Sequence, residues 1–307
     1  MILNKIPHIP VLVKEVTKYL GQIDEGTIID CTLGYGGHSE ALLKLNKNIK
    51  IKAFDQDVTA VEFSKKRLNS YGNKIEILHG RFSQLISTTA NENVKGVLAD
   101  IGVSSLQLDD KRRGFGFDSD NLDMRMDKAK SFSAYDVVNG YEVEKLEEIF
   151  KNYGEVKEYK KIAQLIAKER LKKPFSSAKQ LSSFISKYLY SKKIHPATLV
   201  FQAIRIEVND ELGELKRLLK SIRDLKLSNA TVAIISFHSL EDKIVKQSFK
   251  EWSKSCICSP QAYKCNCGNN HSFGKIVTKK PITAGEEELG KNPRARSAKL
   301  RVFKTKF

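Results

Sequence analysis

Long apolar runs and secretion signals are missing from this chain of 307 residues. No apolar stretch approaches the roughly 20 residues that a helix needs to cross a bilayer. Residues 1–10 lack the basic start, the apolar stretch and the small-residue cleavage site of a signal peptide. Internal repeats and long low-complexity segments are absent as well. Together these absences predict a cytoplasmic protein with no membrane partner.

Acidic residues are scarce relative to basic ones. The chain has 36 Asp and Glu against 53 Lys and Arg, which gives a formal net charge of +17. Such a chain repels itself unless a polyanion neutralises it, and nucleic acid is the usual polyanion. A generally lysine-rich proteome is the alternative explanation. Because the basic residues are spread over several segments and do not line one amphipathic helix, a membrane surface is disfavoured.

The first hundred residues alternate between strand and helix patterns. Short apolar strands are expected over 27–31, 51–55, 74–78 and 96–102, and a helix over 58–71. Short apolar strands separated by helical stretches are typical of a parallel, doubly wound sheet. The composition, with 41% hydrophobic residues, is ordinary for a folded protein with a proper core.

This alternation stops after the fourth strand. Residues 107–130 form a loop rich in Gly, Asp and Arg, and only helices are expected from there to about residue 223. The expected helices cover 134–153, 156–171, 177–189 and 196–223. Strand patterns return over 231–237, 275–282 and 298–304. The sequence therefore predicts one α/β domain, residues 1–107 and 224–307, interrupted by a loop and helical insertion, residues 108–223.

A glycine-rich turn follows the first strand. Its spacing is Gly34-x-Gly36-Gly37, and the second strand ends at Asp55. Glycines let the backbone approach a ligand, and an acidic residue at the tip of the next strand accepts hydrogen bonds from ribose hydroxyls. The spacing differs from the GxGxxG of dinucleotide enzymes, so a nicotinamide dehydrogenase is disfavoured. The pattern indicates a nucleoside ligand without a pyrophosphate, and S-adenosylmethionine is the leading candidate.

Asp100 stands at the end of the fourth strand. Ligands of doubly wound folds bind outside the carboxyl ends of the strands, so Asp100 is expected beside Gly36 and Asp55. A carboxylate there can hold the amino group of a cofactor or orient an incoming amine. A helix or turn cap is the alternative role.

Several blocks of the chain, in the same order, resemble the signatures of one family. The first two are DCTLGYGGHS at 30–39 and DIGVSSLQLD at 100–109. The others are RGF at 113–115 with LDMRMD at 122–127, HPAT at 195–198 with FQAIRI at 201–206, SFHSLED at 236–242 and NPRARS at 292–297. With these blocks the chain resembles the ribosomal RNA small subunit methyltransferase H family, also called MraW.

The resemblance implies an enzyme that methylates the exocyclic N4 of a cytidine in 16S rRNA near the decoding site. It also implies S-adenosylmethionine as methyl donor, and a Rossmann-like class I methyltransferase sheet with an inserted all-helical domain. The implied partner is 16S rRNA within the small ribosomal subunit, and a homodimer is left open. A non-catalytic RNA-binding protein on the same fold is the alternative, but such a protein should have lost pocket residues that are present here.

The candidate site residues fall into two sets, of which the first is carried over from the resemblance. The cofactor contacts are Gly36, Gly37, His38, Asp55, Phe82, Asp100 and Gln107. Phe82 follows the third strand and can flank the adenine face, although a core position is the alternative. Asp100 is also the predicted catalytic hydrogen-bond acceptor for the amine. Backbone carbonyls after Asp100 are its alternative, because the chain lacks the Asp/Asn/Ser-Pro-Pro-aromatic motif of other amino-methyltransferases.

The second set is expected to contact RNA, and it comprises Arg113, Arg205, Asn209, His238, Arg294 and Arg296. Arg113 lies in a loop that mixes basic and aromatic residues, a combination suited to an unstacked base, and a packed or disordered loop is the alternative. Arg205 and Asn209 are one helical turn apart, and an internal hydrogen-bond network is their alternative. Arg294 and Arg296 can grip phosphates, with a solvated turn as the alternative. His238 follows an apolar strand, where a structural role is equally open.

The five cysteines follow a separate pattern. Cys256-x-Cys258 and Cys265-x-Cys267, with His271 nearby, form a compact cluster, while Cys31 reads as a buried apolar residue. Disulfides are disfavoured in the cytoplasm, which leaves a structural zinc or reduced thiols in a loop. C-x-C is tighter than the usual C-x2-C knuckle. Because methyl transfer from a sulfonium needs no metal, no catalytic metal is predicted.

Overall fold

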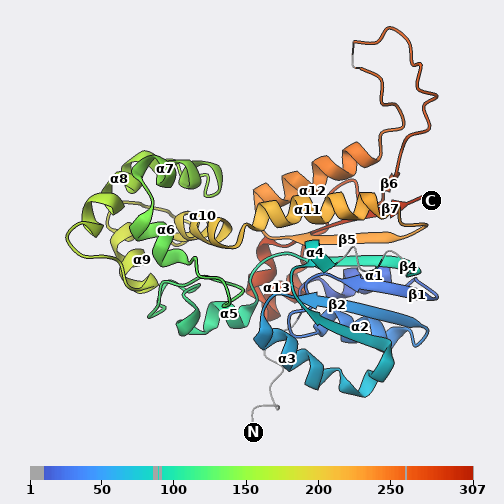
Figure 1. Cartoon of the computed structure of the whole chain (residues 1–307), viewed down its shortest axis with the longest axis horizontal. Coiled ribbons are helices and arrows are strands. Elements are labelled where there is room, and N and C mark those ends of the chain that lie inside the picture. Colours follow the sequence, from blue (N-terminus) through green and yellow to red (C-terminus); the bar gives the residue numbers. More distant parts are fainter. Residues whose placement is uncertain (1–9, 86–88, 90–91, 260, 307) are drawn as a thin grey trace. The chain divides into compact units, whose positions relative to one another are not determined.

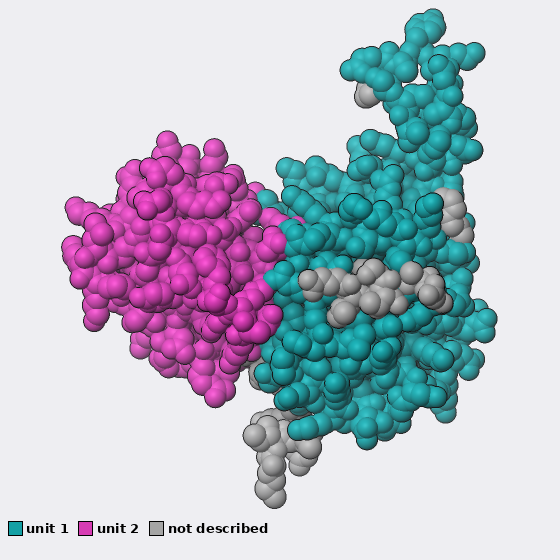
Figure 2. All heavy atoms as spheres, in the orientation of Figure 1, with its two compact units in different colours: residues 1–102, 213–307 teal, residues 103–212 magenta. Residues whose placement is uncertain are grey.

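The computed structural model describes residues 10–85, 89, 92–259 and 261–306. The chain divides into two compact units, Met1–Gly102 with Gly213–Phe307, and Val103–Leu212 (Figure 2). The sequence placed these boundaries after residues 107 and 223, whereas the last long helix of that stretch belongs almost entirely to the first unit. No helix in the described part of the chain has the length and apolar character needed to cross a membrane.

The first unit is built on one mixed sheet, in which seven strands are found among the described residues (Figure 1). The strands are β1 (Gly26–Asp30), β2 (Ile49–Asp55), β3 (Ile75–His79), β4 (Val94–Asp100), β5 (Thr231–Ser236), β6 (Gly274–Ile276) and β7 (Lys299–Thr305). Their order is β3-β2-β1-β4-β5-β7-β6. Strands β1 to β5 pair in parallel, and β7 is antiparallel to both β5 and β6. The predicted Rossmann-like, doubly wound sheet is confirmed, and the reversed β7 is an addition to it.

The central strands are buried on both faces, as expected for parallel strands covered by helices. All residues of β5 are buried, and neighbouring side chains alternate between two cores. Ile234 joins the core with α11 (Glu211–Asp224) and α12 (Ser239–Trp252), while Ala233 faces the core with α1 (Val13–Leu20) and α2 (Gly37–Leu45). Figure 1 shows α11 and α12 together on one side of this sheet.

Some expected helices divide in two, and some helices of the structure were not expected. The stretch 134–153 forms α6 (Ala134–Gly140) and α7 (Val143–Asn152), because Tyr141 is extended between them. The stretch 196–223 breaks after α10 (Thr198–Asn209), because Asp210 has a left-handed backbone with φ of 54°. Helices α1 and α12 were not anticipated. The remaining named elements of the first unit are α3 (Val58–Arg67), α4 (Phe82–Leu85) and α13 (Glu286–Lys291).

The second unit is helical in its described residues and has its own apolar core. It contains α5 (Ser105–Asp109), α6, α7, α8 (Tyr159–Arg170), α9 (Ala178–Ser186) and α10. The loop before α6 is packed into this core through the buried Met124 and Met126. The buried side-chain amide of Asn209 fixes the loop: it accepts from Met126 N at 2.9 Å and donates to Met124 O at 2.8 Å.

Asn209→Ala should destabilise the helical unit, because it leaves the Met126 N–H and the Met124 carbonyl buried without that partner. Each such group costs about 1–3 kcal/mol, so a loss of about 2–4 kcal/mol is expected. Urea unfolding followed by circular dichroism measures the change. Asn121→Ala is the matched control, since that side-chain amide makes an exposed bond to Arg112 O and should change stability by less than about 0.5 kcal/mol. Equal midpoints for the two variants would contradict this role of Asn209.

Candidate active site

The strand order changes direction between β1 and β4. From β1 the chain proceeds outward to β2 and β3, and then crosses over to β4 on the other side of β1. The carboxyl ends of such a strand pair form the crevice in which doubly wound folds bind ligands. The turn after β1 and Asp100 at the end of β4 therefore meet at the edge where a nucleoside ligand is expected.

The glycine turn after β1 has a conformation that depends on glycine. Gly34 and Gly36 have φ of 51° and 76°, in the left-handed region. A Cβ on Gly36 would also lie 2.7 Å from Leu68 Cδ1 of the neighbouring segment. Helix α3 braces the turn, because Ser64 Oγ donates to Gly34 O at 2.8 Å and Arg67 Nη1 donates to Tyr35 O at 2.8 Å. The turn is thus held in place from outside.

Gly37 is the first residue of α2, and a small residue is needed here for packing. A Cβ at this position would lie 3.0 Å from Pro10 Cγ. Close packing against Pro10 therefore requires a small residue here, independently of any ligand.

Asp55, the last residue of β2, binds the glycine turn directly. Gly34 N donates to Oδ2 at 2.7 Å, and Asp57 N donates to Oδ1 at 2.8 Å. Burial raises the pKa of Asp55 to about 6, although these two donors favour the ionised form. Each carboxylate oxygen has a second lone pair, so Asp55 can still accept hydroxyl hydrogen bonds from a ligand.

Asp30 completes this edge and was missed as a site residue. Its side chain is buried, accepts from Ser39 Oγ at 2.6 Å, and accepts from Thr32 N at 3.2 Å. Thr32 Oγ1 in turn accepts from Asp100 N at 2.6 Å, which links β1 to β4. Burial raises the pKa of Asp30. The available sequence signal was the Asp-x-Thr spacing at the strand end, which suits a side chain that bonds its own backbone two residues on.

The side chains of Asp100 and His38 lie close together at the carboxyl ends of the strands. His38 Nε2 lies 3.5 Å from Asp100 Oδ2, and the two side chains are 7% and 17% exposed. Within the described part of the chain, buried Asp100 Oδ1 and both ring nitrogens of His38 have no hydrogen-bond partner. Buried polar atoms of this kind cost free energy unless a ligand satisfies them. The crevice therefore offers an acceptor and a donor for a polar ligand.

The other two cofactor candidates are placed differently. Phe82 begins α4 and is half-buried, packed against the core that α11 and α12 cover, so it also has the core role that the sequence left open. Gln107 lies on α5 in the helical unit. Its Oε1 accepts from Ser104 N at 3.0 Å, and its own N–H donates to Ser104 Oγ at 3.2 Å.

Three predicted RNA contacts lie in the helical unit and make internal bonds there. Arg205 forms a two-point ion pair with Glu211 at 2.9 and 3.0 Å. Asn209 binds the backbone of the loop before α6, as described above. Arg113 is only 5% exposed, and its Nη2 donates to the carbonyls of Arg125 and Met126 at 3.0 Å each. These contacts match the internal network that the sequence left open for Arg205 and Asn209.

The remaining RNA candidates lie at the same sheet edge as Asp100. His238 follows β5, and its Nε2 is 3.0 Å from Oε1 of the fully buried Glu241. Arg294 and Arg296 are exposed on the short helix Pro293–Ser297 that precedes β7. Because β7 runs antiparallel to β5, with Lys299 opposite Ser236, that helix lies at the carboxyl end of β5. The fold thus brings residues from distant sequence blocks to one edge.

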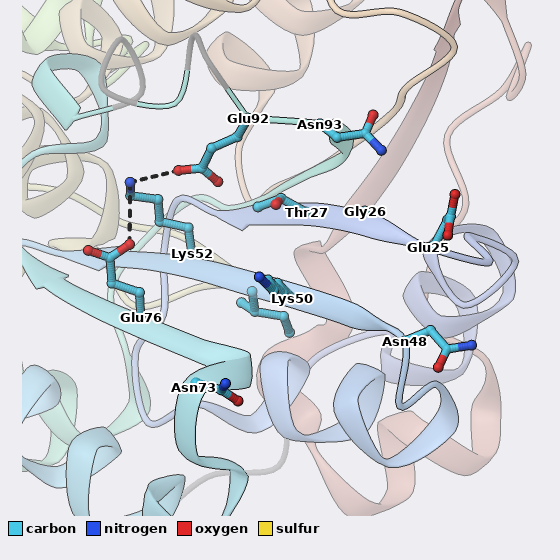
Figure 3. A pocket seen from close by; sticks show the side chains of 11 residues that line it. Glu25, Gly26, Thr27, Asn48, Lys50, Lys52, Asn73, Glu76, Glu92 and Asn93 are labelled. Atoms are coloured by element: carbon cyan, nitrogen blue, oxygen red, sulfur yellow. Dashed lines mark hydrogen bonds and ion pairs between the residues drawn. The ribbon is translucent and has the colours of Figure 1, made fainter.

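A hollow lies at the opposite edge of the sheet (Figure 3). It is lined by residues at the amino ends of the strands, including Thr27, Lys50 and Asn93. Lys52 Nζ contacts Glu92 and Glu76 there, at 2.8 and 3.3 Å. Lys52, Glu76 and Glu92 are thus paired with one another, and the position of the hollow at the amino ends is not where doubly wound folds bind ligands.

The comparisons with known proteins cover nearly the whole chain. The model of the MraW methylase family matches residues 5–306. The ribosomal RNA small subunit methyltransferase H of Aliarcobacter butzleri is 58% identical, over 97% of this chain and 99% of that protein. The proteins of the same name from Nitratiruptor sp. and Helicobacter pylori are 58% and 53% identical, over 98% and 97% of this chain and 99% and 97% of theirs. The chain therefore belongs to the MraW methylase family, and it is a methyltransferase that uses S-adenosylmethionine.

Proposed function

We propose that this protein transfers the methyl group of S-adenosylmethionine to the exocyclic N4 of a cytidine in 16S rRNA, near the decoding site. The observation that carries the proposal is the buried acceptor atom Asp100 Oδ1, which has no partner among the described residues at the switch point of a methylase fold. The names of the relatives support the small-subunit rRNA as substrate. The cytosine amine is the kind of donor that this acceptor suits.

The residues at the edge fit the cofactor. Asp55 would accept the ribose hydroxyls, the Gly34–Gly37 turn would lie against the nucleoside, and Phe82 would flank the adenine. Asp30, Asp55 and Asp100 gather here, and the charge of Asp100 adds to burial in raising the pKa of Asp30. An edge crowded with carboxylates favours a cationic ligand. The bound cofactor supplies a methyl group activated by a sulfonium charge, which requires no metal.

Asp100 has the chemistry that the amine needs. The N4 lone pair of cytosine is delocalised into the ring, so the amine is a weak nucleophile. An N–H bond donated to Asp100 Oδ1 would localise that lone pair on N4. The N4 lone pair would form the new bond to the methyl carbon as the carbon–sulfur bond breaks. The electron pair of the broken bond would stay on sulfur, and N4 would become cationic. The carboxylate of Asp100 stabilises that charge and accepts the proton that N4 then loses. His38 Nε2 lies 3.5 Å from the other carboxylate oxygen of Asp100.

Contacts to the RNA backbone would come from the basic surface. Arg294 and Arg296 are exposed at the edge that holds Asp100, where they can hold phosphates and fix the register of the strand. His238 would lie near the RNA at the same edge. The net charge of +17 adds an attraction that does not depend on sequence. Arg113, Arg205 and Asn209 would shape the helical unit, as the proposed recognition domain. The proposed substrate is 16S rRNA within an assembled small ribosomal subunit, and the proposed location is the cytoplasm.

Asp100→Asn should remove catalysis while keeping the fold. The amide can still accept a hydrogen bond, but it carries no charge and cannot take the proton, so kcat should fall by about 10²–10⁴-fold. The measurement is methyl transfer from labelled S-adenosylmethionine to small subunits that lack the modification, followed by nucleoside analysis for N4-methylcytidine.

Asp24→Asn is the control for this experiment, because that side chain is exposed before β1, at the opposite edge. A kcat for the Asp100 variant within a few-fold of the control would exclude Asp100 as the acceptor. If the wild-type protein bound the subunit but transferred no label, the non-catalytic RNA-binding alternative would replace the proposed function.

Cofactor affinity should depend on the protonation of Asp55. Its pKa is raised from 3.8 to about 6. A protonated carboxyl accepts the Gly34 N–H and ribose hydroxyls poorly, so the Kd for S-adenosylmethionine should rise as the pH falls through 6. Calorimetric titrations at pH 7.5 and pH 5 measure this change. The Asp55→Asn variant should bind S-adenosylmethionine at least about tenfold more weakly at pH 7.5, because it loses one charge-assisted hydrogen bond. The Kd of this variant should vary little with pH. An unchanged pH dependence in this variant would assign the effect to another group.

A further inference from the structure

The segment between α12 and β6 leaves the sheet as a long excursion. Figure 1 shows it projecting from the first unit, and residues 253–259 and 261–273 form no helix or strand. Its base is closed by Phe273 N donating to Trp252 O at 2.7 Å and His271 N donating to Ser255 O at 2.9 Å. Farther out, the apolar side chains of Ile257 and Tyr263 are exposed. The excursion therefore lacks an apolar core that would hold its outer part together.

Four cysteine sulfurs gather inside this excursion. The Sγ atoms of Cys256, Cys258, Cys265 and Cys267 all lie within 4.8 Å of one another. Cys256 and Cys265 are 3.6 Å apart, Cys265 and Cys267 are 3.6 Å apart, and Cys267 and Cys256 are 3.7 Å apart. All four are free thiols, and these distances are far longer than a disulfide bond of about 2.05 Å.

The spacing of the sulfurs is that of a tetrahedral metal site. Zinc binds thiolates at about 2.3 Å, so the corners of a ZnS₄ tetrahedron are about 3.8 Å apart. The separations of 3.6–3.7 Å in this structure are close to that edge length. The tight C-x-C spacing is therefore compatible with such a site, because the two C-x-C pairs face each other and together supply four sulfurs.

The backbone around the sulfurs has a twofold pattern. Ile257, the middle residue of the first C-x-C, donates its N–H to Cys267 Sγ at 3.4 Å. Asn266, the middle residue of the second, donates its N–H to Cys258 Sγ at 3.4 Å. Each pair thus supplies a donor to the second cysteine of the other pair. Donors of this kind stabilise thiolates and orient metal ligands.

His271, the other candidate ligand of the sequence pattern, has a different partner. Its Nε2 lies 2.6 Å from Cys267 O, so the ring donates to the backbone next to the cluster. The ligand set is therefore the four cysteines, with the histidine as a support.

We propose that Cys256, Cys258, Cys265 and Cys267 bind one structural Zn²⁺ that fixes the excursion. Four thiolates fill the tetrahedral shell and leave no position for substrate, which is the mark of a structural site. Each thiol loses its proton on binding. The excursion also starts at the carboxyl end of α12, a helix whose amino end adjoins His238 and the candidate active site. The metal is therefore remote from the chemistry. Small segments without a core commonly depend on such a bound metal.

Metal analysis of the full-length protein tests this proposal. Protein stripped of metal under reducing conditions and then given excess Zn²⁺ should retain one zinc per chain after desalting, by mass spectrometry of the metal. Cys265→Ser/Cys267→Ser should retain none. His271→Ala is the control, and it should keep one zinc because the ring is not a ligand. Zinc-free wild-type protein after this treatment, iron as the tightly bound metal of the isolated protein, or loss of zinc in the histidine variant would each overturn the four-cysteine zinc site.

A second readout tests the structural role without using activity. Lys264 lies between the two cysteine pairs and is exposed. Trypsin should cleave after Lys264 at least tenfold faster in the metal-stripped protein than in the zinc-loaded protein. The double cysteine variant should be cleaved fast with or without zinc, while cleavage elsewhere in the chain serves as the internal reference. Equal cleavage rates for the stripped and loaded wild-type proteins would rule out a role of zinc in fixing the excursion.

Discussion

The bond between Thr32 and Asp100 joins the two strands on which the candidate site depends. Thr32 Oγ1 accepts a hydrogen bond from Asp100 N just beyond the paired part of β1 and β4. Thr32 is itself held in place because its backbone N–H donates to the side chain of Asp30. These strands flank the point where the sheet changes direction, so any shift between them would separate the glycine turn from the Asp100 carboxylate. Burying the carboxylate of Asp30 costs folding free energy, because burial disfavours its charged form and raises its pKa. The two hydrogen bonds that Asp30 accepts, from Ser39 Oγ and Thr32 N, offset part of that cost.

Charge is distributed unevenly in this protein, and the distribution fits the proposed function. The chain as a whole is strongly basic, yet the crevice collects Asp30, Asp55 and Asp100. The net charge of the whole molecule suits the proposed rRNA substrate, whereas the carboxylates at the strand ends suit the sulfonium of the cofactor. Arg294 and Arg296 lie exposed at that edge because β7 reverses direction beside β5. The antiparallel strand thereby places the two exposed arginines, which are the proposed phosphate contacts, near the proposed cofactor site.

Residues with similar sequence signals have different surroundings in the fold. Asp55 and Asp100 both end apolar strands, but both oxygens of Asp55 already accept backbone N–H groups, while Asp100 Oδ1 has no partner in the described part of the chain. Arg113 was expected to contact RNA, yet it is buried against loop carbonyls. Arg296, with the same chemistry, is exposed. Side-chain type alone cannot separate these cases, because burial depends on segments that are distant in sequence.

The sequence by itself determined the sheet type, the glycine turn, the acidic strand ends and the family resemblance, because each depends on local periodicity or short spacing. It did not reveal α12, which packs its buried Val245 and Phe249 into one of the two cores of the sheet. Only the tertiary structure brought Asp30, Thr32 and Asp100 into one hydrogen-bonded junction. It also brought the two C-x-C pairs face to face, which the spacing alone left undecided. The reason is physical: hydrogen bonds and metal-ligand geometry depend on distances in space, which the chain sets only when it has folded.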